Sequence, residues 1–304
     1  GPIFKMSQIH RPVVCITDLT VARDLLAMPE VFTQSDWSFN RLVPRGYIEY
    51  MNGDVHAAYR AIFAHGFTRA IVDGGRTAMS ESARAQLRQM AANTNGGGLD
   101  PEPWLLPVSL TSLLHTVLGV SATHERFAEL SALFTQLNRP VELFLPTPRR
   151  TQETYEAINA IVVALIAAAK DHAPAHASVL GTMAQRHEPP FGDATATGNL
   201  ILMVKEGSIM VRGLLRWVLK RMAEDEQWAR RFRAVAHDAT RLDVEATAFV
   251  LETIRLHENR YLYRVASRET RVGPYTIPAG WLVRLCLGEA HENPAHFPDP
   301  QRFD

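Results

Sequence analysis

The segment Glu252-Thr253-Ile254-Arg255 places a carboxylate and a guanidinium three residues apart. On a helix, side chains with this spacing share a face and can form an ion pair. Apolar residues at Val244, Ala248, Leu251 and Ile254 predict such a helix, with a buried stripe along one side. Considered alone, the two charges are most simply an exposed pair, and an exposed pair contributes little to stability.

A second pair of polar side chains lies about two hundred residues upstream, in Gly53-Asp54-Val55-His56-Ala57-Ala58-Tyr59-Arg60. His56 and Arg60 are four residues apart, so both project from one helical face. Two cationic donors on one face suit a pair of anionic oxygens. A solvated helix of mixed polarity would have the same pattern, so these residues alone leave both interpretations open.

The order of motifs after Arg255 resembles that of the cytochrome P450 family. Downstream of the Glu-x-x-Arg helix come an I-P-x-G strand, an A-x-x-x-P-x-x-F stretch and a Pro-x-Arg-Phe loop, which are here Ile277–Gly280, Ala290–Phe297 and Pro300–Phe303. The resemblance implies that Arg302 joins Glu252 and Arg255 in a structural charge cluster. It also implies that His56, Arg60 and Arg264 contact the propionates of a haem.

The long helix departs from the family's pattern at the position where oxygen is activated. Members that split oxygen usually carry Ala-Gly-x-Asp/Glu-Thr-Thr there, and the adjacent acid and alcohol deliver protons. Here the run is Glu206-Gly207-Ser208-Ile209-Met210-Val211. Gly207 is kept, as close passage over a flat macrocycle would require, but Ile209 and Met210 replace the acid and the alcohol. Glu206 and Ser208 do not face each other on a helix, so the catalytic residues stay unassigned.

The sequence contains two cysteines, Cys15 and Cys286. The resemblance implies an axial cysteine in a Phe-x-x-Gly-x-x-x-Cys-x-Gly loop after the Pro-x-Arg-Phe segment. Neither cysteine has these neighbours, and both lie in strand-like runs, so we expect buried core residues. No metal ligand is predicted within the chain. We expect the axial cysteine beyond Asp304 and interpret the chain as a fragment truncated at both ends, with a natural haem-free relative as the alternative.

The elements that must position these residues are mostly helices. Asp18 is expected to cap a helix that ends at Leu26, and a further helix should begin near Asp54. Other helical patterns cover residues 77–93, 104–118, 124–137, 151–170, 176–187, 199–224, 226–237 and 244–257, and strand patterns cover 13–17, 262–265, 271–277 and 281–287. The pattern predicts a mainly α fold with a small β flank. The resemblance makes this a truncated cytochrome P450 fold, one incomplete domain over residues 1–304.

Composition narrows the class of protein. The chain is 46% hydrophobic and 21% charged, as in soluble globular proteins. Lys+Arg and Asp+Glu balance at 32 each, which argues against nucleic-acid and acidic-membrane binding. The most apolar run, Ala157–Ala169, is shorter than the ~20 residues that cross a bilayer, so no membrane segment is predicted. Two cysteines far apart in sequence suit a reducing cytosol, so we expect a cytoplasmic protein.

The resemblance implies a b-type haem, iron protoporphyrin IX, between the long helix and the cysteine loop. The expected activity is that of a monooxygenase that acts on a small apolar organic substrate and receives electrons from a ferredoxin-type donor. The chain as given is expected to be inactive, because it lacks the cysteine loop. Two alternatives remain: a haem enzyme that works without the acid–alcohol pair, such as a peroxygenase, isomerase or dehydratase, and a haem-free helper protein that binds a partner enzyme.

Overall fold

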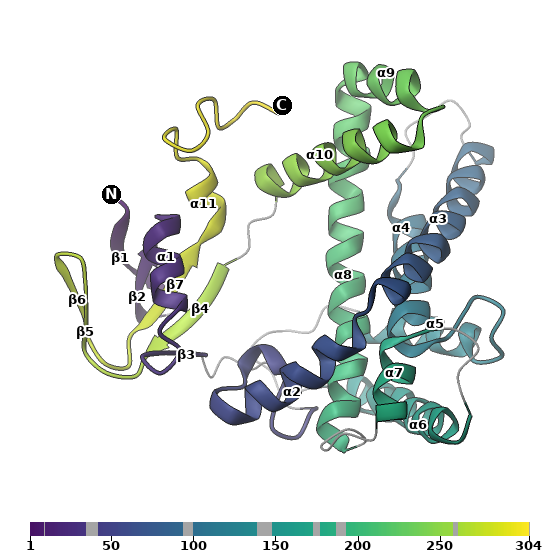
Figure 1. The fold of residues 1–304 in the computed structure, drawn as a ribbon, viewed down its shortest axis with the longest axis horizontal. Helices are drawn as coiled ribbons and strands as arrows, with labels where there is room; N and C mark the ends of the chain where they lie inside the picture. Colours follow the sequence, from purple (N-terminus) through teal and green to yellow (C-terminus); the bar gives the residue numbers. More distant parts are fainter. Residues whose placement is uncertain are drawn as a thin grey trace. The chain divides into compact units, whose positions relative to one another are not determined.

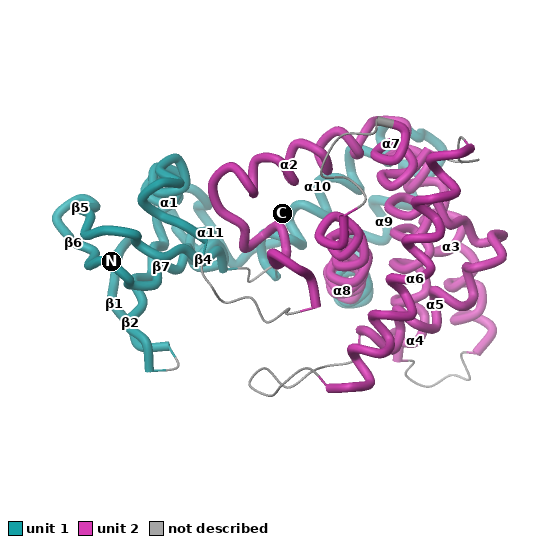
Figure 2. The backbone as a smooth tube through the Cα atoms, turned by 90° about the horizontal axis from the view of Figure 1, so that it is seen from below, with its two compact units in different colours: residues 1–36, 217–304 teal, residues 37–216 magenta. Residues whose placement is uncertain are grey.

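The computed structural model describes residues 1–8, 10–34, 42–93, 100–138, 148–172, 177–186, 193–257 and 261–303. They form two compact units, the first from residues 1–36 and 217–304 and the second from residues 37–216 (Figure 2). The boundary at residue 216 falls inside one helix, α8 (Ala194–Glu224). That the whole chain is a single domain stays a prediction.

The first unit contains a five-stranded sheet built from both ends of the sequence. Its strand order is β1 (Ile3–Gln8), β2 (Arg11–Ile16), β7 (Leu282–Cys286), β4 (Tyr261–Ala266), β3 (Phe32–Gln34). β2 and β7 run parallel, whereas the other neighbours are antiparallel. Successive side chains of a strand point to opposite faces. Val14 and Ile16 therefore pack in one apolar cluster, and Val13 and Cys15 pack in another.

Short elements complete the first unit. As predicted, Asp18 caps α1 (Leu19–Leu26), because its carboxylate accepts hydrogen bonds from the amides of Thr20 and Val21. A two-stranded hairpin turns at Gly273, whose φ of +58° favours glycine. The remaining elements are β5 (Thr270–Val272), β6 (Tyr275–Ile277), α9 (Glu226–Val235), α10 (Ala239–His257) and α11 (Leu287–His291).

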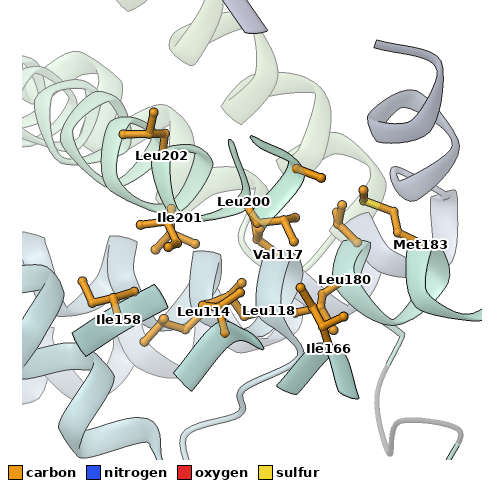
Figure 3. Packing of buried hydrophobic residues seen from close by; sticks show 14 of the residues in the cluster. Leu114, Val117, Leu118, Ile158, Ile166, Leu180, Met183, Leu200, Ile201 and Leu202 are labelled. Carbon is orange, nitrogen blue, oxygen red and sulfur yellow. The ribbon is translucent and has the colours of Figure 1, made fainter. Parts of the chain in front are cut away.

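The second unit is helical, and α8 is the longest helix of the described residues (Figure 1). Asp193 caps its start by accepting a hydrogen bond from the Ala196 amide at 2.7 Å. The other helices are α2 (Gly53–Gly66), α3 (Arg69–Ala92), α4 (Glu102–Leu113), α5 (Phe127–Leu137), α6 (Arg149–Asp171) and α7 (Val179–Arg186), with a 3₁₀ turn at Ile48–Tyr50 and a π-turn at Leu114–Leu118. Leucine and isoleucine side chains of α6, α8 and the π-turn form the core (Figure 3).

The predicted mainly α architecture with a small β flank is confirmed. Three helices begin at least five residues earlier than expected: α3 at Arg69 rather than Thr77, α8 at Ala194 rather than about Asn199, and α10 at Ala239 rather than Val244. The extended α3 continues through Gly74 and Gly75. A Cβ atom at Gly75 would overlap Oγ1 of Thr116, so the glycine allows a close approach to the π-turn. The predicted helix ends at His176 and His187, and the final Asp304, lie outside the described residues.

Candidate functional site

Glu252 and Arg255 form a bidentate ion pair on α10. Arg255 donates from Nε to Oε2 of Glu252 at 2.7 Å and from Nη2 to Oε1 at 2.6 Å. The hydrogen bonds to Glu252 raise the pKa of Arg255 despite its burial, so the guanidinium stays charged. The main-chain carbonyl of Arg302 accepts from Nη2 at 2.9 Å. Arg302 thus joins the cluster through its backbone, and a role for its side chain stays a prediction.

The apolar stripe predicted beside this pair is wrong. Val244 and Leu251 are 64% and 61% exposed, whereas Phe249 and Thr253 are the buried residues of α10. Phe249 contacts the rings of Trp228 and Phe303, with centroids 5.1 Å away in each case. The ring contacts of Phe249 with Trp228 and Phe303 therefore determine which side of α10 is buried.

The second predicted pair lies on α2. This helix buries Tyr59, whose hydroxyl donates to Oδ2 of Asp193 at 2.5 Å. His56 is half-buried and Arg60 is exposed. Among the described residues, Arg60 has no hydrogen-bond or ion-pair partner. An exposed guanidinium on the same helix face as a histidine is suited to bind an anionic group.

Arg264, the third predicted propionate contact, lies on β4 in the first unit. Its Nη1 donates to the carbonyl of Tyr263 at 2.7 Å, and the residue is half-buried. His56 and Arg60 belong to the second unit. That the three side chains converge on one haem stays a prediction.

The centre of α8 holds Glu206 and Ser208 apart. Glu206 pairs with Nζ of Lys205 at 2.7 Å. Ser208 is fully buried, and its hydroxyl donates to the Lys205 carbonyl at 2.8 Å and accepts from Nδ2 of Asn138 at 2.8 Å. The acid and the alcohol thus have different partners. As the side-chain directions on a helix predict, the two side chains point to different partners.

Gly207 has a packing role in the second unit. A Cβ atom there would lie 3.0 Å from Cδ1 of Leu113 on α4, which accounts for glycine without any cofactor. Contact between Gly207 and a haem stays a prediction.

Glu206 and Met210 occupy a different, more exposed face of α8, and each exposes 40%. Gly213 shares that face and has no atom within 4 Å of a Cβ position. The sequence interpretation did not place Gly213 on this face, although its spacing from Glu206, about two helical turns, predicts that the two share one side of the helix.

The two cysteines are core residues of the sheet, as predicted. Cys15 and Cys286 expose 0% and 1% and share an apolar cluster with Val13 and Leu282. Burial, followed by the neighbouring Cys286, raises the pKa of Cys15 to about 11, which disfavours the thiolate that binds iron. Across the described ranges, no group of three or more acidic, histidine or cysteine side chains could hold a metal ion.

The comparisons with known proteins point to one family. Residues 239–304 match the family model of cytochrome P450. Abscisic acid 8'-hydroxylase 1 of Oryza sativa subsp. japonica is 23% identical over 326 residues, which cover 100% of this chain and 68% of that protein. Cyclooctat-9-en-7-ol 5-monooxygenase of Streptomyces melanosporofaciens is 25% identical over 272 residues, with 82% and 56% covered.

Solved structures have the same fold. Retinoic acid-bound cyanobacterial CYP120A1 aligns with a TM-score of 0.82 and 19% identity, covering 100% of this chain and 73% of its own. P450BioI, in complex with an acyl carrier protein that carries hexadec-9Z-enoic acid, aligns with a TM-score of 0.77 and 18% identity, covering 100% and 78%. The motif order, the family-model match over residues 239–304 and the fold all support a cytochrome P450.

Proposed function

We propose that the complete protein is a haem-dependent monooxygenase acting on a small apolar molecule. The observation that carries the proposal is the Glu252–Arg255 pair, which lies in the segment that matches the family model and bonds to carbonyls of the Pro-x-Arg-Phe loop. The names of two relatives, a hydroxylase of abscisic acid and a monooxygenase of cyclooctat-9-en-7-ol, support a substrate that is mostly hydrocarbon.

The residues of the second unit fit a haem with anionic propionates. Arg60 is an exposed cation without a partner in the described ranges, and His56 shares its helix face. These two residues, with Arg264, would hold a b-type haem, and its thiolate ligand would come from outside these 304 residues. When bound, the haem supplies the oxidative chemistry, while the protein binds and orients the substrate. A ferredoxin-type electron donor and a cytoplasmic location belong to this proposal.

The contacts of α8 favour a second candidate, a peroxide-dependent haem enzyme. Glu206 is paired with Lys205, Ser208 is bonded to Asn138, and the residue on the exposed face next to Glu206 is the apolar Met210. Positioned proton donors typically contribute about 10²–10⁴-fold to rate. Without them, a reaction that draws on reductant and oxygen would be poorly coupled. Peroxide arrives already reduced and protonated, so it avoids this need.

The test compares the two oxidants on the full-length, haem-loaded protein. Abscisic acid and retinoic acid serve as trial substrates, with either hydrogen peroxide or ferredoxin, reductant and oxygen. The peroxide-dependent candidate predicts more product with peroxide, and little product per reductant consumed. Tight coupling of reductant to product would refute the peroxide-dependent candidate and leave the monooxygenase. Failure of the full-length protein to take up haem and to show the thiolate-type absorption of the ferrous–carbonyl complex would refute both and support a haem-free helper protein.

A further inference from the structure

The second unit contains a pocket of about 550 Å³ bounded by α3, α4, α5 and α8. Apolar side chains form much of its wall, among them Leu106, Leu110 and Phe127. Pockets of roughly 300–1,000 Å³ with apolar walls and a few polar groups are typical of sites for small molecules. The pocket is therefore large enough for an organic ligand.

This pocket lies on a different side of α8 from Met210, the residue at the family's oxygen-activation position. Arg212 is the residue of α8 that lines it. Residues two apart on a helix point about 200° from each other, so Arg212 lies on the opposite side from Met210. A ligand in the pocket would contact the α4 and α5 side of the long helix.

Polar groups in the wall have unused hydrogen-bonding capacity. Oγ of Ser131 is buried and has no partner among the described residues. Gln86, at the α3 side, also has no side-chain partner in the described part of the chain. Because Pro107 has no amide hydrogen, the carbonyl of Pro103 lacks its helical donor. A buried group such as Oγ of Ser131 is normally satisfied, and a ligand with its own polar end would satisfy it.

The charges at the pocket favour an anionic end on that ligand. Arg212 lies 3.9 Å from Glu102, measured from Nε to Oε2, and Arg216 pairs with the same carboxylate. Two guanidinium groups therefore share one carboxylate, which leaves one positive charge uncompensated. A carboxylate on the ligand would be attracted, and a cationic ligand would be repelled. We propose that this pocket binds a small apolar molecule that carries a single carboxylate.

Calorimetric titration of the full-length protein with decanoate tests the proposal, with 1-decanol as the neutral probe of matched length. Arg212→Gln removes the charge and keeps an aliphatic stem. We expect this variant to bind decanoate roughly ten- to a hundredfold more weakly, as for loss of a hydrogen bond to a charged group, and to bind decanol as before. Arg149→Gln is the matched control, because Arg149 lies on α6, is 93% exposed and does not line the pocket.

A second variant, Ser131→Phe, fills the pocket and should abolish binding of both probes. Its circular dichroism spectrum and melting temperature establish that it folds. Decanoate affinity that is unchanged by Arg212→Gln, or lowered equally by Arg149→Gln, would overturn the carboxylate assignment. Binding that survives in folded Ser131→Phe would place the ligand elsewhere and overturn the pocket itself. None of these results depends on the oxidant experiment, so the two proposals can fail separately.

Discussion

The guanidinium of Arg255 meets the carboxylate of Glu252 through two parallel hydrogen bonds while exposing only 9% of its side chain, against 16% for Glu252. It also donates from Nη1 to the carbonyl of Pro300 at 2.7 Å and from Nη2 to that of Arg302 at 2.9 Å. A single side chain therefore links α10 to the last described residues of the chain. Removing it would leave one carboxylate and three carbonyls, those of His291, Pro300 and Arg302, without this donor.

Replacement of Arg255 by leucine should lower the free energy of unfolding by about 3–5 kcal/mol, because it removes the bidentate partner of a largely buried carboxylate. Urea denaturation monitored by circular dichroism measures the change. Arg149→Leu breaks an exposed pair with Glu153 and should cost about 0–1 kcal/mol. Equal losses in the two variants would show that the buried pair has no special role.

A second prediction concerns the pH dependence of stability. His257 stacks on Trp217 with ring centroids 3.9 Å apart, and Nε of Arg221 donates to its Nε2 at 2.8 Å. Burial, followed by the charges of Arg221 and Lys220, lowers the pKa of His257 below its usual 6.5. As the pH falls, the unfolded chain therefore takes up a proton on this histidine at a higher pH than the folded chain does. This contribution to stability is complete above about pH 6.5 and is lost as the pH falls from 6.5 towards the folded pKa.

His257→Phe keeps a stacking ring and removes the titration. We expect the wild-type protein to lose more unfolding free energy between pH 7.5 and pH 5 than the variant does. Denaturation curves at several pH values provide the comparison. Parallel pH profiles for the two proteins would contradict the assignment to His257.

A third prediction uses two glycines of α8 as a matched pair. Gly213→Ala adds a methyl group where nothing lies within 4 Å, so it should stabilise the helix by about 0.5–1 kcal/mol. Gly207→Ala places its methyl group 3.0 Å from Leu113, and such overpacking costs roughly 1–3 kcal/mol. Thermal denaturation should rank Gly213→Ala above wild type and Gly207→Ala below it. The reverse order of melting temperatures would contradict the surroundings described for the two glycines.

A fourth prediction concerns haem retention. Arg60→Leu should lower the haem content of the purified full-length protein, because the variant loses a cation expected to bind a propionate. Absorbance of extracted haem per mole of protein is the measurement. Arg69→Leu, on an exposed residue that pairs with Asp73, should retain the wild-type content. Equal haem content in all three proteins would remove Arg60 from the proposed site.

Local signals were enough to predict much of the fold. Asp18 identified the start of α1, and the Glu252-x-x-Arg255 spacing identified the pair on α10, because both depend on residues close in sequence. The burial of α10 was not predictable in this way. Its orientation depends on Phe249 meeting Trp228 and Phe303, and these residues come together only when the chain folds.

The candidate site shows the same limit. Sequence reasoning aligned Gly207 with a family glycine but could not detect Leu113 on α4 as its neighbour. It identified Glu206 and Ser208 as the polar residues near the centre of α8. Their different partners, Lys205 and Asn138, depend on side-chain directions and on where α5 ends. Spacing along one helix could be read from the sequence, whereas contacts between helices could not be predicted from it.

The parallel pairing of β2 with β7 has a consequence for how the protein is made. Val13 lies opposite Leu282, so its partner strand leaves the ribosome about 270 residues later. At roughly 5–20 residues per second, this delay is on the order of 15–50 s. Throughout it, the apolar Val13–Ile16 edge of the first hairpin stays open, and open strand edges pair readily with other chains. The β1–β2 hairpin therefore stays open to pairing with other chains until β7 emerges.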